Sequence, residues 1–200
     1  MVRPLFLHSD SVASSNCADV VARPASASIA VPADDWRESL MRSHSDFFPT
    51  LPGGPALPLC GPRWRDIIER CCVRIEDALS RRETFRFERI AEFQGVLRFY
   101  WGGSLSAPSE AKVRLAIDLA EARSQCVCEI CGGRGRLHRH DNSFETRCSA
   151  HAYGEPVPVK PGFENMHLRQ KTVVGRVRAV VCSFYDFEHD AFLDIGPSEL

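Results

Sequence analysis

The chain has 200 residues, of which 44% are hydrophobic and 26% are charged, and its formal net charge is −1. This length and apolar fraction are sufficient for one hydrophobic core and a small satellite module. No apolar run approaches the roughly 20 residues that a membrane-spanning helix requires. The balance of 25 basic against 26 acidic residues excludes a chain that is basic overall. We therefore expect a protein with one core that does not cross a membrane.

Cysteine usage predicts a reducing compartment. The chain has nine cysteines, an odd number, whereas a secreted disulfide framework uses an even set. Near the start of the chain only Leu5, Phe6 and Leu7 form an apolar run, which is shorter than the roughly 7–15 residues of a secretory signal core. We expect a cytoplasmic protein whose thiols are free to bind a metal.

The first part of the chain shows no regular period. Residues 1–33 are rich in Ser, Ala, Val and Pro, and this composition predicts a disordered lead-in. Residues 49–62 hold five prolines and three glycines and predict a loop that leads to the core. The core itself is assigned to residues 34–125.

Three elements are predicted within this core. Apolar residues at steps of three and four over residues 64–79 predict an amphipathic helix. Residues 84–93 and 96–101 alternate between apolar and polar side chains, and Gln94-Gly95 offers a turn between them. This pattern predicts a β-hairpin. A second helix is predicted over residues 108–124.

The phase of the first strand, the helix cap and the aromatic residues of the hairpin together predict the fold class. Arg89 and Ile90 fall out of phase with the alternation of the first strand, and Ser106 or Ser109 is a candidate N-cap of the second helix. Five aromatic residues of the hairpin are expected on its buried face, under the helices: Phe85, Phe87, Phe93, Phe99 and Trp101. We therefore predict an α+β fold with a small antiparallel sheet covered by two helices.

Residues 126–155 predict a zinc-binding module. Four potential ligands form two pairs, each with two intervening residues: Cys128, Cys131, Cys148 and His151. At this spacing one tight turn directs both side chains of a pair to a single ion, and Gly132 supplies the backbone freedom for the first turn. The segment between the pairs predicts a hairpin around Asp141-Asn142. Three thiolates and one imidazole suit a structural, tetrahedral Zn²⁺ ion in a hairpin module of the zinc-ribbon or treble-clef type.

Alternative ligands and an alternative role remain open. Three further residues lie close enough in the sequence to replace a ligand: Cys126, His138 and His140. A catalytic zinc ion would need an open coordination position and a nearby general base, for which Glu129 and Glu145 are the local candidates. A metal-dependent hydrolase is therefore the competing class of protein.

The last part of the chain, residues 156–200, is predicted to be a linker followed by a β-hairpin. The linker contains three prolines and Gly162. Residues 172–185 and 191–195 are β-branched and aromatic, with an acidic turn between them, which is typical of two paired strands.

Two further segments, Gly61–Trp64 and Phe93–Tyr100, precede the four predicted ligands, which are called the quartet below. This order of motifs resembles that of a group of uncharacterised bacterial and phage-borne proteins. In that group a segment similar to KEKFGGLRFY precedes a helix and a CEVCG…C..H zinc module. The resemblance covers roughly residues 61–153 and implies the zinc ligands and the order of the elements. Because Glu92-Phe93-Gln94 replaces the lysine-bearing part of the motif, no role of that lysine carries over. No activity is established for the group.

The hairpin between the ligand pairs is locally basic. It and its flanks carry four arginines that are candidates for partner binding: Arg134, Arg136, Arg139 and Arg147. A basic zinc hairpin can contact phosphates, which makes a nucleic acid one expected partner. The net charge of −1 slightly favours a protein partner instead. We predict a non-enzymatic, structural-zinc binding module that engages a macromolecule.

Overall fold

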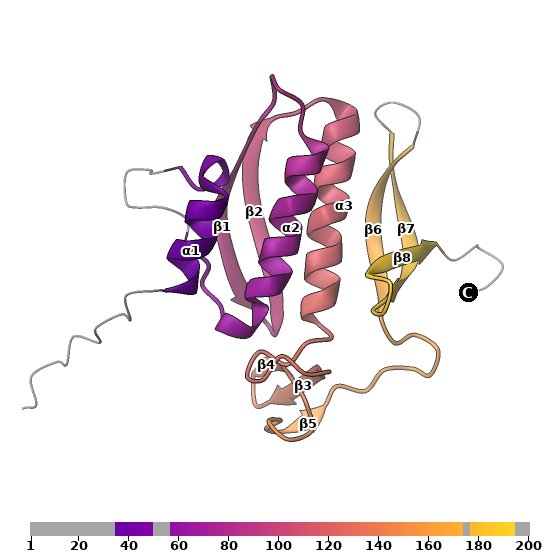
Figure 1. Cartoon of the computed structure of the whole chain (residues 1–200). Helices are drawn as coiled ribbons and strands as arrows, with labels where there is room; N and C mark the ends of the chain where they lie inside the picture. The colour runs from indigo at the N-terminus through magenta and orange to yellow at the C-terminus, as the bar shows by residue number, and fades with distance from the viewer. Residues whose placement is uncertain (1–34, 50–56, 174–176, 195–200) are drawn as a thin grey trace, which may run out of the picture. The chain divides into compact units, whose positions relative to one another are not determined.

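The computed structural model describes residues 35–49, 57–173 and 177–194 (Figure 1). The predicted lead-in of residues 1–33 lies outside these residues, as do residues 50–56 of the predicted loop. The described chain is a mixed α/β structure with three α-helices and three small antiparallel sheets. In chain order, its elements are α1 (Trp36–Ser43), η1 (Ser45–Phe47), η2 (Pro62–Trp64), α2 (Arg65–Ala78), β1 (Thr84–Phe93), β2 (Val96–Ser104), α3 (Ala107–Ser124), β3 (Arg136–His140), β4 (Ser143–Arg147), β5 (Glu155–Pro156), β6 (Met166–Val173), β7 (Val177–Asp186) and β8 (Ala191–Asp194).

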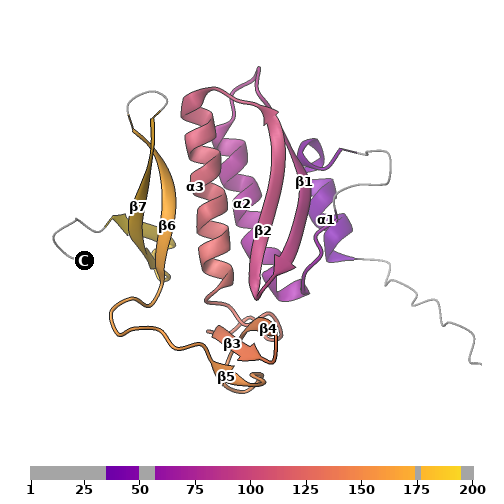
Figure 2. The ribbon, with the colours of Figure 1, turned by 180° about the vertical axis from the view of Figure 1, so that it is seen from behind.

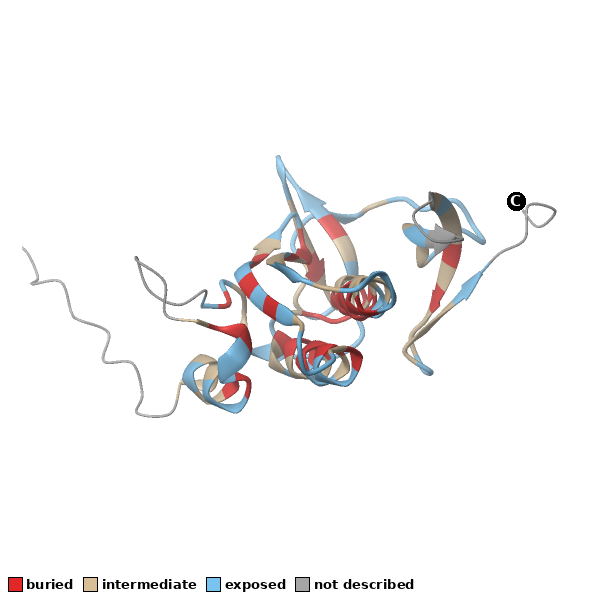
Figure 3. Ribbon diagram, turned by 90° about the horizontal axis from the view of Figure 1, so that it is seen from above, coloured by how far each residue is buried: buried red, intermediate tan, exposed pale blue. Residues whose placement is uncertain are grey.

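The first sheet pairs β1 with β2, and α2 and α3 cover one of its faces (Figures 1 and 2). The predicted helix, hairpin and second helix are therefore confirmed. Ser106 is the N-cap of α3, because its hydroxyl accepts a hydrogen bond from the Ser109 N–H. Buried residues lie on the helices and on the first sheet, as the red parts of the ribbon show (Figure 3). The core that they form includes Trp64, Ile68, Phe87, Leu97 and Val113.

A β-bulge in β1 corrects one expectation about the core. The pairing register with β2 shifts between Phe87 and Arg89, at the break in alternation that the sequence shows. Phe87 and, after the bulge, Ile90 both face the core, so the phase of the strand is reversed beyond this point. Phe93 is consequently 62% exposed, and the prediction that it joins the buried face is wrong.

Helix α1 was not predicted from the sequence. It spans eight residues that are mostly polar or charged, so its apolar period is too short to recognise. Asp35 caps it by accepting a hydrogen bond from the Arg37 N–H, and Leu40 is fully buried in the core. After α1, Phe47 packs edge-on against Phe85, with ring centroids 5.1 Å apart. The core thus begins well before the first predicted helix.

Helix α3 is buried on two sides. Val113 and Ile117 face the first core, whereas Leu119 and Ala122 belong to a second cluster around Tyr185 of β7. The helix therefore joins the β1–β2 layer to the C-terminal sheet, whose strand order is β6-β7-β8.

The C-terminal sheet has one strand more than expected. β7 and β8 form the predicted hairpin, and β6, which begins in the segment assigned to a linker, pairs antiparallel with β7. Its alternation is inverted relative to the usual pattern, since Leu168 is 78% exposed while His167 and Arg169 lie against the ring of Phe192. Because polar residues occupy its inner face, hydrophobic periodicity did not reveal this strand.

His167 is expected to make the protein less stable in acid. Burial, together with the charges of Arg169 and Arg98, lowers its pKa from 6.5 to about 4. The unfolded chain then binds the proton more readily, so this contribution to stability is complete above pH 6.5 and is lost as the pH falls toward 4. The free energy of unfolding, measured by urea denaturation, should fall between neutral pH and pH ~5. In the His167→Gln variant this fall should be smaller by about 1–2 kcal/mol. Equal pH dependence in the two proteins would contradict this role.

Candidate metal centre

The first ligand pair lies on a tight turn after α3. The Gly132 N–H donates to the Cys128 carbonyl at 2.8 Å, and the Cys128 N–H donates to the Gly133 carbonyl at 2.8 Å. These bonds close the turn that carries Cys128 and Cys131. Gly132 has a φ of 79°, a backbone conformation that favours glycine. The turn therefore requires the conformational freedom that was predicted for Gly132.

Strands β3 and β4 return the chain to this turn. They pair antiparallel over their full length, and Asp141 in the two-residue turn between them has a φ of 52°. β4 leads directly to the second pair, where the His151 N–H donates to the Cys148 carbonyl at 3.0 Å. The predicted hairpin is thus the element that brings the second pair against the first.

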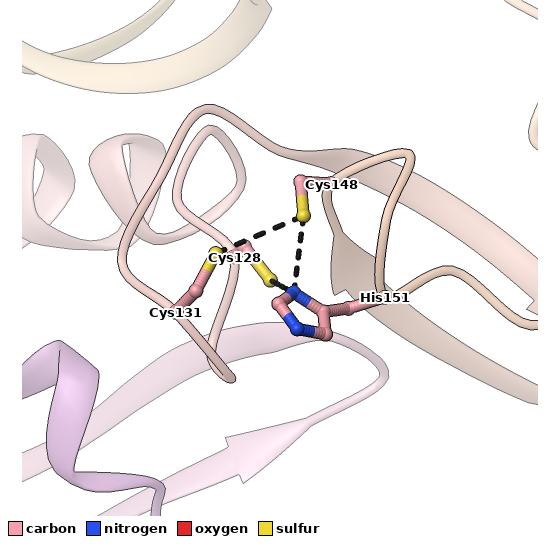
Figure 4. A group of neighbouring side chains, drawn as sticks. All are labelled: Cys128, Cys131, Cys148 and His151. Carbon is pink, nitrogen blue, oxygen red and sulfur yellow. Dashed lines mark hydrogen bonds between the residues drawn. The ribbon is translucent and has the colours of Figure 1, made fainter.

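The four side chains converge on one point (Figure 4). Their donor atoms all lie within 4.8 Å of one another. The Sγ atoms of Cys131 and Cys148 are 3.7 Å apart, and His151 Nδ1 lies 3.2 Å from Cys148 Sγ and 3.9 Å from Cys128 Sγ. In a tetrahedral zinc site with Zn–S bonds of about 2.3 Å, two sulfurs are about 3.8 Å apart. The quartet is therefore positioned to bind one metal ion.

The local backbone favours the thiolate form of Cys128. Burial raises the pKa of this thiol, but hydrogen bonds from the backbone at Cys148, Cys131 and Ile130 more than offset that effect and lower the pKa to about 6. A thiolate is the form of cysteine that binds a metal. The turn thus favours the metal-binding form of Cys128.

The alternative ligands lie outside the quartet. Among the described residues, the Cys126 thiol donates to the side chain of Asn165 at 3.3 Å. His138 is buried with its Nδ1 3.0 Å from the Arg136 carbonyl oxygen, and His140 is exposed. His151 is therefore the histidine that the fold brings to the three sulfurs.

Two buried hydrogen bonds attach this module to the core. Trp64, at the start of α2, donates through Nε1 to the Val127 carbonyl at 3.0 Å. The Thr146 hydroxyl of β4 donates to the Gly95 carbonyl, in the β1–β2 turn, at 2.6 Å. In the sequence, Trp64 and Gly95 are recognisable only as parts of a predicted helix and a predicted turn. Their one signal was that both lie in the two segments that carry the resemblance.

Arg147 is engaged within the module. It forms ion pairs with Glu129 and, at 3.3 Å, with Glu145. Burial raises the pKa of the Glu129 carboxyl, against the lowering effect of the Arg147 charge. Arg147 is thus less accessible to a partner than the sequence suggests, and both glutamates that were candidates for a general base are paired with it.

Of the other three arginines of the predicted partner surface, Arg136 lies directly opposite Arg147 across the β3–β4 pair. The Arg134 guanidinium lies 3.8 Å from the ring centroid of Phe187. Arg136 and Arg139 are exposed on β3. They lie three residues apart on one strand and so point to opposite faces. The four arginines therefore do not form one continuous patch.

The fold and the quartet together define a mixed α/β protein with a four-donor Cys3His centre. No protein-family model, curated protein or solved structure matches the chain. None of the helices in the described part of the chain combines the length and the apolarity needed to span a bilayer.

Proposed function

We propose that the quartet binds one structural Zn²⁺ ion and that the chain is a non-enzymatic binding protein whose zinc-held surface engages a macromolecule. The observation that carries this proposal is the convergence of four protein donors within 4.8 Å of one another. Four such ligands complete a tetrahedral shell, whereas a catalytic zinc ion keeps a position for water.

The surroundings of the quartet support a structural role. Hydrolysis by a metal-bound water also needs a base to accept its proton. Glu129 and Glu145, the local candidates, both pair with Arg147, so their carboxylates are engaged in ion pairs within the module. The metal-dependent hydrolase is accordingly the weaker proposal.

The composition of the module explains why it would need a metal. Its buried side chains are few and mostly small or polar: Cys126, Val127, Cys128, His138 and Thr146. Such a set contributes little hydrophobic free energy to folding. Zinc would supply that free energy, as it does in small zinc-ribbon-like domains.

The partner is proposed to be a macromolecule that contacts the module and the adjacent core. A protein partner, which the overall charge slightly favours, and a nucleic acid are the two classes. Arg136 and Arg139 are exposed and available to either class, since a guanidinium binds both carboxylates and phosphates.

Cobalt substitution tests the structural role of the metal. Replacing the metal with Co²⁺ in the full chain should give the absorption spectrum of a tetrahedral ion with thiolate ligands, at one ion per chain, and azide should not change it. A five-coordinate spectrum, or a spectrum that shifts on addition of azide, would show an open position and favour the hydrolase. Cys182, which lies in β7 outside the quartet, offers a control, because the Cys182→Ser variant should give the same spectrum.

A further inference from the structure

A cleft of about 550 Å³ lies where the start of α2, the end of α3 and the first ligand turn meet. Four arginines and two aromatic residues line it: Arg63, Arg65, Arg70, Arg123, Trp36 and Phe187. Asp66 also lines the cleft, and Cys131 and Gly132 of the ligand turn form part of its wall. The cleft is therefore cationic, although the chain as a whole is not.

The neighbouring carboxylates balance these arginines only in part. Glu69 lies 3.9 Å from Arg65. Asp190, in the β7–β8 turn, is shared by three guanidiniums, with N–O distances of 2.9 Å to Arg74, 3.5 Å to Arg70 and 3.6 Å to Arg123. Burial, followed by the charge of Arg123, lowers the pKa of Arg70. Crowded, partly buried cations of this kind favour the binding of an anion.

The aromatic residues of the cleft lie beside guanidinium groups. The Phe187 ring is flanked by Arg123 and Arg134, whose guanidinium carbons are 4.1 Å and 3.8 Å from its centroid. The Arg37 guanidinium lies 4.6 Å from the Trp36 ring. These cation–π contacts hold the guanidinium groups at the wall of the cleft, where they can meet a phosphate.

Two hydrogen-bond donors of cleft residues are unsatisfied. Trp36 Nε1 and Arg123 Nε are both buried and have no hydrogen-bond partner among the described residues. A buried donor without an acceptor costs free energy and calls for an explanation. Both donors belong to residues that line the cleft, so an acceptor bound there is a candidate partner for them.

The geometry points to a phosphate-ester site in this cleft, in which the Arg63, Arg65 and Arg123 guanidiniums bind the phosphate of a nucleotide or of a nucleic-acid strand. Guanidiniums suit this ligand because their planar, multiple N–H donors match phosphate oxygens. The inference rests on the proposed function, because the metal-held turn forms one wall of the site. It places the contact with phosphate outside the β3–β4 hairpin, to which the sequence had assigned it.

Charge reversal at the mouth of the cleft tests the site. The full chain, loaded with zinc, would be titrated into a fluorescein-labelled oligothymidine of about 20 nucleotides and followed by fluorescence anisotropy over a salt series. The Arg63→Glu/Arg65→Glu variant should bind at least about tenfold more weakly, and its salt slope should fall by about 1.4, because each phosphate contact on a single strand contributes about 0.7. The Arg81→Glu/Arg82→Glu variant is the matched control, with the same change in charge at two exposed residues between α2 and β1, and should retain its affinity. The Arg136→Glu/Arg139→Glu variant tests β3 as the alternative place of contact.

Two further measurements separate the outcomes. Calorimetric titration with adenosine monophosphate and with inorganic phosphate shows whether a free phosphate ester, rather than a strand, is the source of the ligand. Weak binding of all three probes would overturn the site and would leave a protein as the partner. A larger loss of affinity in the β3 variant than in the cleft variant would also overturn the site. Zinc content and the cobalt spectrum of each variant report on the proposed function separately, since the cleft can fail to bind phosphate while the metal centre stays intact.

Discussion

Replacing Cys131 with serine is expected to abolish metal binding and to unfold residues 126–155, while the core built on α2 and α3 stays folded. Cys131 supplies one of the three sulfurs of the quartet, and a serine hydroxyl does not replace a thiolate on zinc. Zinc binding by small domains releases about 10–16 kcal/mol, most of which is folding free energy. The few buried side chains of the module do not replace that contribution.

Metal analysis and hydrogen exchange measure this effect. Zinc content should fall from about one ion per chain to near zero, and loss of amide protection should be confined to the module, above all to β3 and β4. Cys126→Ser is the matched control, because the Cys126 thiol bonds to Asn165 and not to the quartet, and serine can keep that bond. Full metal content in Cys131→Ser, or loss of metal in Cys126→Ser, would show that the ligands are assigned incorrectly.

Replacing Trp64 with alanine is expected to destabilise the core by about 3–5 kcal/mol, the usual range for loss of a buried large aromatic side chain. The side chain is fully buried in the core, and its Nε1 donates to the Val127 carbonyl next to the first ligand pair. The substitution therefore removes packing in the core and a bond to the metal module together. Urea denaturation of the zinc-loaded chain measures the loss of stability.

The Trp64→Phe variant separates these two effects. Phenylalanine keeps most of the packing but leaves the Val127 carbonyl without its donor, at a cost of about 1–3 kcal/mol. Zinc should then pass to a chelator faster than from the unaltered protein. The matched control is Trp101→Phe, since Trp101 packs on Phe85 in the same sheet and does not contact the module. Equal rates of zinc release in both variants would show that the Trp64 bond does not stabilise the metal centre.

Local patterns made the core elements and the ligand quartet predictable. The periods of α2, β1 and β2 are visible because each has one face toward the core. Helix α3 is buried on two sides, and its N-terminal cap made it recognisable as well. The ligands followed from spacing, since two residues between ligands place both on one turn. Even the β1 bulge was visible, as a break in alternation at Arg89. The exposure of Phe93 was not predictable, because the direction of a side chain beyond a bulge depends on the pairing of the strand.

The elements that escaped prediction are those whose burial comes from distant parts of the chain. α1 is too short and polar to show a period, and it is held by Leu40 in a core that other elements complete. β6 presents polar residues inward, and Arg169 is compensated there by Asp118 on α3 at 3.3 Å and by the ring of Phe192. Neither arrangement leaves a local signal, since the compensating partner lies elsewhere in the sequence.

By itself, the sequence determined the four candidate metal ligands, the hairpin that joins them and the secondary structure of the core, because each depends on residues a few positions apart. Only the tertiary structure decided what surrounds the metal centre. Arg63, Arg123 and Phe187 are far apart in the chain and meet in one cleft because α2, α3 and the β7–β8 turn pack together. A cluster of charged residues that forms through such packing has no regular period or spacing in the sequence. It is therefore visible only in the folded structure.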